Sequence, residues 1–298
     1  MRIAVNVNGY NRPGHLKKTL EAISLSECTY DVYIDLDGPR SSFDRDACSL
    51  CLGVANDFAL SYPYTCYVSK SVVNNGLASS ILCSIESRLS KYDFAIFLED
   101  DIVVTSAFFH FMEASAKKYK NNSRVMQVSG FNHSHRATDT VMSFFLPFTT
   151  SWGWGTWPRA WNCYDRGVNG WLEYFKPLFR RVIFDLGCGF YEQVLANHTG
   201  KKLTWAIFWY ASVFREKGLV LYPSSSLISN IGHDGSGENC KPSKAYDAHL
   251  KSSEIGNILL PDDLKICLIP LIKFVFGNWL TRARGLMGRV LLGLKERN

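Results

Sequence analysis

Strand-like and helix-like segments alternate along the first hundred residues, and this alternation limits the possible folds more than any other feature. Residues 3–7 and 31–36 are rich in β-branched and apolar side chains, and residues 94–98 are apolar throughout. Apolar residues at helical spacing lie between these runs, around residues 16–23 and 77–89. Strands that alternate with helices predict an α/β domain with a mixed, mostly parallel sheet flanked by helices.

Charge is distributed unevenly along the chain. Its 298 residues are 47% apolar and 20% charged, and they carry a formal net charge of +6. Residues 264–298 contain seven Lys and Arg but only one Glu, so the whole excess belongs to this segment. A neutral body with a basic tail argues against nucleic acid as a partner. We therefore expect a globular domain over residues 1–263, followed by a distinct tail.

Cysteine usage and hydropathy bear on the compartment. The nine cysteines are scattered along the chain without the regular spacings of a disulfide framework. The chain opens on a strand-like run, so we expect no signal peptide, and no apolar run reaches membrane-spanning length. These observations predict a cytoplasmic protein.

The sharpest polar feature is the acidic triplet Glu99-Asp100-Asp101, directly after the apolar run 94–98. Three adjacent carboxylates repel one another unless a cation neutralises them. Mg²⁺ or Mn²⁺ bound by one or two carboxylates and by substrate phosphates would supply that cation. The alternative is a solvated acidic turn. In open α/β sheets ligands bind beyond the carboxyl ends of the strands, which favours a functional site.

Seven segments in order resemble GT-A-fold nucleotide-sugar glycosyltransferases, and most closely the bacterial polysaccharide transferases related to N-acetylglucosaminyltransferase I. The resemblance extends over about residues 2–240. The segments are VNGYNRP (7–13), IDLDG (34–38), NNGLASSI (74–81), FAIFLEDDIVVTSAFFHFM (94–112), SWGWGTWPRAW (151–161), LTWAIFWY (203–210) and NIGHDGSG (230–237). It implies a GT-A, Rossmann-like domain over residues 1–263, with a nucleotide-sugar half (1–130) and an acceptor half (131–263).

The same resemblance implies a nucleotide-sugar donor, with UDP as the nucleotide. Arg12 resembles an arginine on the diphosphate side, and Asp37 resembles an acid that hydrogen-bonds the uracil and ribose. Asn75 lies in a loop that approaches the nucleotide. Each has a structural alternative: Arg12 as a surface charge, Asp37 as a turn former, and Asn75 as a helix cap.

The resemblance also assigns the acidic triplet. Asp101 resembles the direct ligand of Mn²⁺ or Mg²⁺, and Glu99 and Asp100 would then face the donor sugar and the ribose. His233 would be a further metal ligand or a phosphate contact, or else a plain loop histidine.

One departure from the family pattern concerns the catalytic base. An inverting transferase needs a carboxylate to accept the proton of the acceptor hydroxyl. In N-acetylglucosaminyltransferase I this acid follows the tryptophan of a segment like LTWAIFWY, where this chain has Ala206. Asp234 is the first candidate base, with a turn residue as the alternative, and Glu192 and Asp165 are weaker candidates.

Seven of the eight tryptophans lie between residues 152 and 209, interleaved with glycines, and this composition predicts a loop-rich substrate region. The run 152–157 resembles the acceptor-side floor of the family, and indole rings stack on the apolar faces of sugars. We therefore expect at least one of Trp152, Trp154 and Trp157 to contact the acceptor, with a place in the core as the alternative for these rings. Trp161 and Trp209 are expected in the core.

The tail, residues 264–298, mixes apolar residues with regularly spaced Lys and Arg. Such a basic amphipathic segment predicts attachment to an anionic membrane surface, here the inner face of the plasma membrane, where a lipid-linked saccharide acceptor would lie. The alternative is a C-terminal helix that packs on the domain or joins a homodimer. Pro270 predicts a bend or two short helices.

The resulting hypothesis is a metal-dependent glycosyltransferase that moves a sugar from a nucleotide diphosphate to an acceptor in bacterial surface polysaccharide assembly, such as O-antigen or capsule. Two other functions stay open. A nucleotidyltransferase also combines a Rossmann-like sheet with acidic metal ligands, but residues 5–15 lack the Gly-rich basic loop that those enzymes use. A non-catalytic carbohydrate-binding protein would use the tryptophans but leaves the acidic triplet unexplained.

Overall fold

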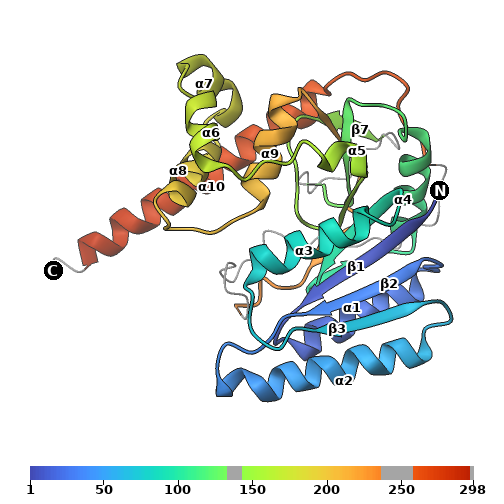
Figure 1. The fold of residues 1–298 in the computed structure, drawn as a ribbon. Coiled ribbons are helices and arrows are strands. Elements are labelled where there is room, and N and C mark those ends of the chain that lie inside the picture. The colour runs from blue at the N-terminus through green and yellow to red at the C-terminus, as the bar shows by residue number, and fades with distance from the viewer. Residues whose placement is uncertain (133–142, 236–257, 296–298) are drawn as a thin grey trace.

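The computed structural model describes residues 1–132, 143–235 and 258–295, with side chains up to Ala283. In this part of the chain, eight strands form a large mixed sheet (Figure 1). In spatial order they are β3 (Cys66–Lys70), β2 (Asp31–Leu36), β1 (Ile3–Gly9), β4 (Phe94–Glu99), β8 (Trp154–Thr156), β6 (Val125–Ser129), β9 (Leu219–Tyr222) and β7 (Phe144–Leu146). β3, β2, β1 and β4 run parallel, as do β6 and β9, whereas β8 and β7 are antiparallel to their neighbours. The predicted mixed, mostly parallel sheet is confirmed.

Helices cover both faces of this sheet. One apolar cluster joins the sheet to α1 (Pro13–Leu25), α2 (Arg45–Ser61) and α4 (Ala107–Lys118), and a second joins it to α3 (Leu77–Leu89) and α9 (Ala206–Arg215). Side chains of β4 alternate between the two clusters: Phe94, Ile96 and Leu98 enter the first, and Ala95 and Phe97 enter the second. The apolar run 94–98 is therefore the central strand that its composition predicts.

The tryptophan-rich region is mostly helical, which corrects the prediction of a loop-rich segment. It forms α5 (Pro158–Trp161), α6 (Val168–Tyr174), α7 (Leu178–Asp185), α8 (Phe190–His198) and α9. Its aromatic side chains pack on one another in the second apolar cluster, and this packing stabilises helices that are too short to be stable alone. Glycines between them serve the turns: Gly187 and Gly189, after α7, have φ values of +73° and +83°.

A small antiparallel pair of strands lies beside the main sheet. β5 (Ile102–Val104) follows β4 almost directly, and it pairs with β10 (Ile228–Asn230). A short 3-10 turn (Ser42–Asp44) precedes α2. Because β10 is fixed beside β5, residues 231–235 lie next to the acidic end of β4, although they are distant in the sequence.

The tail begins as part of the domain. The amide of Cys267 donates to the carbonyl of Phe145 at 3.0 Å, and Phe274 of α10 (Leu268–Lys295) stacks on Phe148 with ring centroids 4.3 Å apart. The predicted break at Pro270 is wrong, because this proline lies in the first turn of α10, where a backbone N–H has no partner within the helix. Within the described ranges, no helix combines the length and the apolarity needed to cross a bilayer.

Candidate functional site

The carboxyl ends of β1, β2 and β4 meet at one edge of the sheet. β1 lies between the other two strands, with Gly9 opposite Leu36 and Asn8 opposite Glu99. The residues that follow these strands are therefore neighbours in space, with Arg12 after β1, Asp37 after β2 and the acidic triplet at the end of β4. Arg12, Asp37 and the acidic triplet thus share one edge.

A buried ion-pair cluster forms at this edge. The Nη2 atom of Arg12 donates to Asp100 Oδ1 and to Asp101 Oδ2, the latter at 2.9 Å. The side chains of Asp100 and Asp101 are only 4% and 9% exposed, and that of Arg12 is 19% exposed. Thr19 Oγ1 donates to the carbonyl oxygen of Asp100 at 2.8 Å, which ties the cluster to α1. Arg12 is therefore a partner of the acidic triplet and not a solvated surface charge.

Burial and charge shift the protonation of this cluster. Burial raises the pKa of Glu99 to about 8, and the charges of Asp101 and Asp100 act in the same direction. Burial also raises the pKa of Asp100, although Arg12 opposes this shift. Burial alone would lower the pKa of Arg12, but the two aspartates hold it above its ordinary value. One guanidinium therefore shares two carboxylates, with a largely neutral Glu99 beside them.

Residues 231–235 complete the edge from the other side. The amide of Ile231 donates to the carbonyl of Asp101 at 2.9 Å, and a Cβ atom on Gly232 would overlap the carboxylate of Asp101. Asp234 lies farther out, with its side chain half exposed and its Oδ2 atom 3.1 Å from Nε2 of His15. The structure therefore places Asp234 at the same edge as the acidic triplet.

The donor set at this edge is compatible with a hard divalent cation. Asp100 and Asp101 offer carboxylate oxygens, which pair with Arg12 in this structure, and Gly232 packs directly against the carboxylate of Asp101. Within the described residues, no group of three or more His, Cys, Asp and Glu side chains is arranged as a metal site. Two carboxylates suit an ion that takes its other ligands from a phosphate and from water.

Asp37 acts on the loop before α3. Its Oδ1 atom accepts the amides of Gly38 and Asn75, both at 2.9 Å, and its Oδ2 atom accepts the amide of Gly76 at 3.0 Å. The exposed side chain of Asn75 donates to Ser71 Oγ at 3.0 Å. The carboxylate of Asp37 thus orders the loop that carries Asn75, and its contact with a nucleotide stays a prediction.

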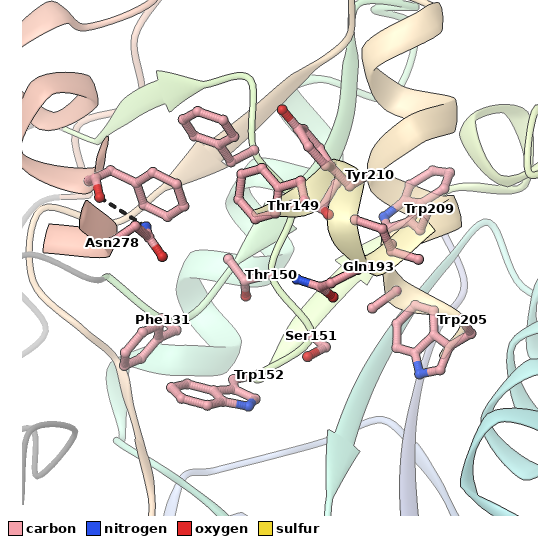
Figure 2. A pocket seen from close by; sticks show the side chains of 15 residues that line it. Phe131, Thr149, Thr150, Ser151, Trp152, Gln193, Trp205, Trp209, Tyr210 and Asn278 are labelled. Carbon is pink, nitrogen blue, oxygen red and sulfur yellow. Dashed lines mark hydrogen bonds between the residues drawn. The ribbon is translucent and has the colours of Figure 1, made fainter. Parts of the chain in front are cut away.

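A cavity of about 240 Å³ lies on the α9 side of the sheet. Figure 2 shows its lining, which includes residues 149–152, Trp205 at the start of α9, Tyr210 within α9 and Asn278 of α10. The wall is mainly aromatic, but Gln127 crosses behind it, donating to the Thr150 carbonyl at 2.8 Å and accepting from Trp209 Nε1 at 2.6 Å. Large rings with a few fixed polar atoms are typical of a small-molecule pocket.

Trp152 connects this cavity with the acidic edge. It lines the cavity, and its ring contacts the ring of His233 edge to face, with centroids 5.4 Å apart. Trp154 and Trp157 are each 1% exposed. Trp154, on β8, packs in the second apolar cluster, and Trp157, which follows β8, packs in the first. Neither offers a free ring face to an acceptor in this structure. Trp161 and Trp209 are also buried, and Trp209 forms part of the cavity wall.

The candidate bases fall in different places. Glu192 on α8 forms a two-pronged ion pair with Arg282 of α10, at 2.7 and 3.1 Å. Asp165 accepts from Arg215 at 3.2 Å and from the Gly167 amide at 2.8 Å. Both carboxylates thus hold neighbouring elements together. Ala206, where the sequence resemblance leads us to expect an acid, lines the cavity with a methyl group.

Sequence reasoning missed several residues that shape the site. Gly232 was not distinguished from its neighbours, although its lack of a side chain leaves room for Asp101. Gln127 reads as an ordinary strand residue, and Asn278 lies in a tail that was separated from the domain. A polar residue inside the apolar strand 125–129 was the one available signal, because buried polar groups need partners.

Comparison with known proteins gave weak matches. No protein-family model and no curated protein matches the chain. The galactosyltransferase LgtC, in complex with donor and acceptor sugar analogues, aligns over 74% of this chain and 72% of its own, with a TM-score of 0.39 and 8% identity. A 4-diphosphocytidyl-2C-methyl-D-erythritol synthase from Anaerococcus prevotii aligns over 76% and 88%, with a TM-score of 0.41 and 9% identity. An active-site mutant of LgtC aligns over 59% and 65%, with a TM-score of 0.34 and 10% identity.

These likenesses are too slight to carry an inference about chemistry. What the chain does has to be argued from its own residues, and its relation to N-acetylglucosaminyltransferase I stays a prediction from the sequence.

Proposed function

We propose that the chain is a glycosyltransferase that moves a sugar from a nucleotide diphosphate, UDP in the first instance, to a saccharide acceptor. One observation carries the proposal: the buried cluster of Arg12, Asp100 and Asp101 lies at the carboxyl edge of the parallel strands, and Trp152 and His233 link it to an aromatic cavity. A charged subsite beside an aromatic one suits a substrate with a diphosphate and a sugar.

The acidic edge is the proposed donor subsite. Arg12 is the basic side chain that would approach the diphosphate. The loop ordered by Asp37 would form the side of the subsite next to the nucleotide. Asp101, with Asp100, would hold Mn²⁺ or Mg²⁺ once phosphate oxygens are present. A bound divalent ion would supply Lewis acidity that offsets negative charge on the departing diphosphate. Glu99, beside this ion, would face the donor sugar.

The cavity is the proposed acceptor subsite, with Trp152 at its boundary with the donor side. Since position 206 carries a methyl group, the proton of the acceptor hydroxyl needs another carboxylate. Asp234 is that residue in this proposal, because it lies at the donor edge and follows His233, whose ring touches Trp152. The hydrogen bond to His15 would orient its carboxylate.

The setting we propose is assembly of a bacterial surface polysaccharide on a lipid-linked acceptor at the inner face of the plasma membrane. The basic tail supports this setting, because its charge is suited to an anionic membrane surface. A membrane-bound acceptor would then be confined to the same surface as the enzyme.

The decisive experiment is a screen of nucleotide sugars for metal-dependent hydrolysis, read by mass spectrometry. The intact protein should release free sugar and nucleoside diphosphate from one donor or a few, and Asp101→Ala should abolish this release and the Mn²⁺-dependence of UDP affinity. Release of pyrophosphate from a nucleoside triphosphate would instead indicate a nucleotidyltransferase. Saccharide binding without any nucleotide affinity would indicate a carbohydrate-binding protein.

A further inference from the structure

Helix α7 is amphipathic, but its apolar face points away from the domain toward solvent. Leu178, Phe179, Val182 and Ile183 recur at helical spacing on one face and are between 55% and 67% exposed. Only Phe184 is buried. Water therefore covers the apolar face of α7, an arrangement that a monomeric soluble protein rarely maintains without a use for it.

The two arginines of α7 contact aromatic rings of neighbouring elements. Arg180 donates to the carbonyl of Tyr174 at 3.1 Å and lies over its ring, and Arg181 lies 5.6 Å from the ring centre of Tyr191. Both guanidinium groups thus help to fix the helix on α6 and α8, with its apolar face outward.

Helix α10 presents a second apolar face. Leu268, Ile272, Phe276 and Trp279 follow at helical spacing and are between 51% and 67% exposed. The other side of the helix is fixed to the domain through Phe274, which is 7% exposed. Trp279 Nε1 donates to the carbonyl of Leu186, just beyond α7, at 2.7 Å. The outward direction of this face is therefore set by packing.

The two faces are continuous. An open groove of about 840 Å³ runs between α7 and α10, and its exposed surface is mainly apolar. Val182 lies on the α7 side together with Arg181 and Asp185, and Ile272, Val275 and Phe276 lie on the α10 side. We call the exposed residues Leu178, Phe179, Val182 and Ile183 of α7, with Leu268, Ile272, Phe276 and Trp279 of α10, the α7–α10 face. It lies far from β1–β3, where the nucleotide side of the sheet is located (Figure 1).

Charge indicates what covers this face. The sequence of α10 contains five basic residues and no acidic residue, and one of the five, Arg282, pairs with Glu192 of α8. A protein partner or a second copy of this chain would have to accommodate that unbalanced charge on a surface that is otherwise apolar. An anionic bilayer supplies both complements, acyl chains for the apolar side chains and phosphate head groups for the basic ones.

We propose that the α7–α10 face docks on an anionic phospholipid bilayer, with α7 inserting its apolar residues beside α10. The membrane contact is thus made by two helices from separate parts of the chain, so that the docking orientation is fixed by the folded domain. This inference deepens the membrane part of the proposed function. Its test uses no substrate, so docking and transferase activity can fail independently.

The experiment is sedimentation of the full chain with phosphatidylcholine vesicles, with and without phosphatidylglycerol. The intact protein should bind the phosphatidylglycerol vesicles, and high salt should weaken that binding. The double variant Phe179→Glu/Ile183→Glu should lower vesicle affinity by about tenfold or more, since it places two charges in the inserted face. Both residues are more than half exposed, so the fold should survive, as circular dichroism would verify.

A matched control is Phe43→Glu, at a phenylalanine that is 94% exposed near α2. It should bind vesicles like the parent. Equal binding by the parent and the α7 double variant would overturn the proposal, and so would equal losses in the double variant and the control. A parent that ignores the vesicles and forms a dimer in light scattering, which the double variant loses, would identify a second copy as the occupant.

Discussion

The acidic edge and the aromatic cavity are neighbours, but opposite kinds of interaction hold them together. At the edge, one guanidinium compensates two buried carboxylates, and losing it would leave two unpaired charges that are costly to bury. The cavity wall consists mainly of aromatic rings packed on one another, and behind it Trp209 donates a hydrogen bond to the buried Gln127. The edge is therefore suited to capture a charged ligand, whereas the cavity wall mainly stabilises the fold and shapes a pocket.

The largest expected effect concerns turnover at the edge. Asp234→Asn keeps the shape of the side chain but removes its capacity to accept a proton, so turnover should fall by roughly 10²–10⁴-fold with donor affinity nearly unchanged. Steady-state kinetics and calorimetry with the donor would measure the two quantities. Weaker donor binding at normal turnover would make Asp234 a binding residue and direct the search to Glu192 and Asp165.

Arg12→Ala tests whether the edge depends on charge compensation. It leaves Asp100 and Asp101 buried without their shared cation, so the free energy of unfolding should fall by about 3–5 kcal/mol. Urea denaturation would measure this loss. Adding Asp101→Asn to the variant should recover part of it, because one unpaired charge is removed; no recovery would mean that the guanidinium acts through packing.

Trp209→Phe tests the cavity wall in the same way. It removes the donor to Gln127 Oε1 inside the core, so the free energy of unfolding should fall by about 1–3 kcal/mol. A double-mutant cycle with Gln127→Leu should give a coupling energy, since the two side chains share one hydrogen bond. Strictly additive losses would remove this bond from the description of the wall.

Trp152→Ala should have the smallest effect and the most selective one. The partly exposed ring lies between the two regions, so its loss should raise the KM for an acceptor by about tenfold through lost stacking, at unchanged donor affinity. Acceptor titrations at saturating donor would show this. A matching loss of donor affinity would place Trp152 in the donor subsite.

The parallel half of the sheet was predictable because each of its strands carries its own signal. Residues 94–98 are apolar on both faces, and polar residues follow directly, so the sequence alone locates the edge of the sheet. Helix α2 was missed, since much of its surface faces water and only Cys48, Cys51, Ala55 and Phe58 are buried. Such a helix has too narrow an apolar stripe to stand out from the sequence.

The remaining parts of the site depend on contacts between distant residues. Asp37 accepts amides some forty positions along the chain, and Gly232 meets Asp101 only because β10 pairs with β5. The assignment of Trp154 and Trp157 to the acceptor side came from a sequence resemblance, and a sequence pattern does not distinguish a ring in the core from a ring at a cleft. Whether a tryptophan ring is buried depends on the strands and helices that pack around it once the sheet has formed.

The position of β8 in the sheet affects how the chain folds while it is being synthesised. This strand contributes Trp154–Thr156 to the middle of the sheet, between β4 and β6, yet it is made well after both of them. During synthesis, β4 therefore emerges from the ribosome with one side of its backbone unpaired, and it stays so until the later strand arrives. An apolar strand with an open edge readily pairs with other chains. We expect the nascent chain to depend on chaperones over this interval, and a fragment that ends near residue 130 to aggregate.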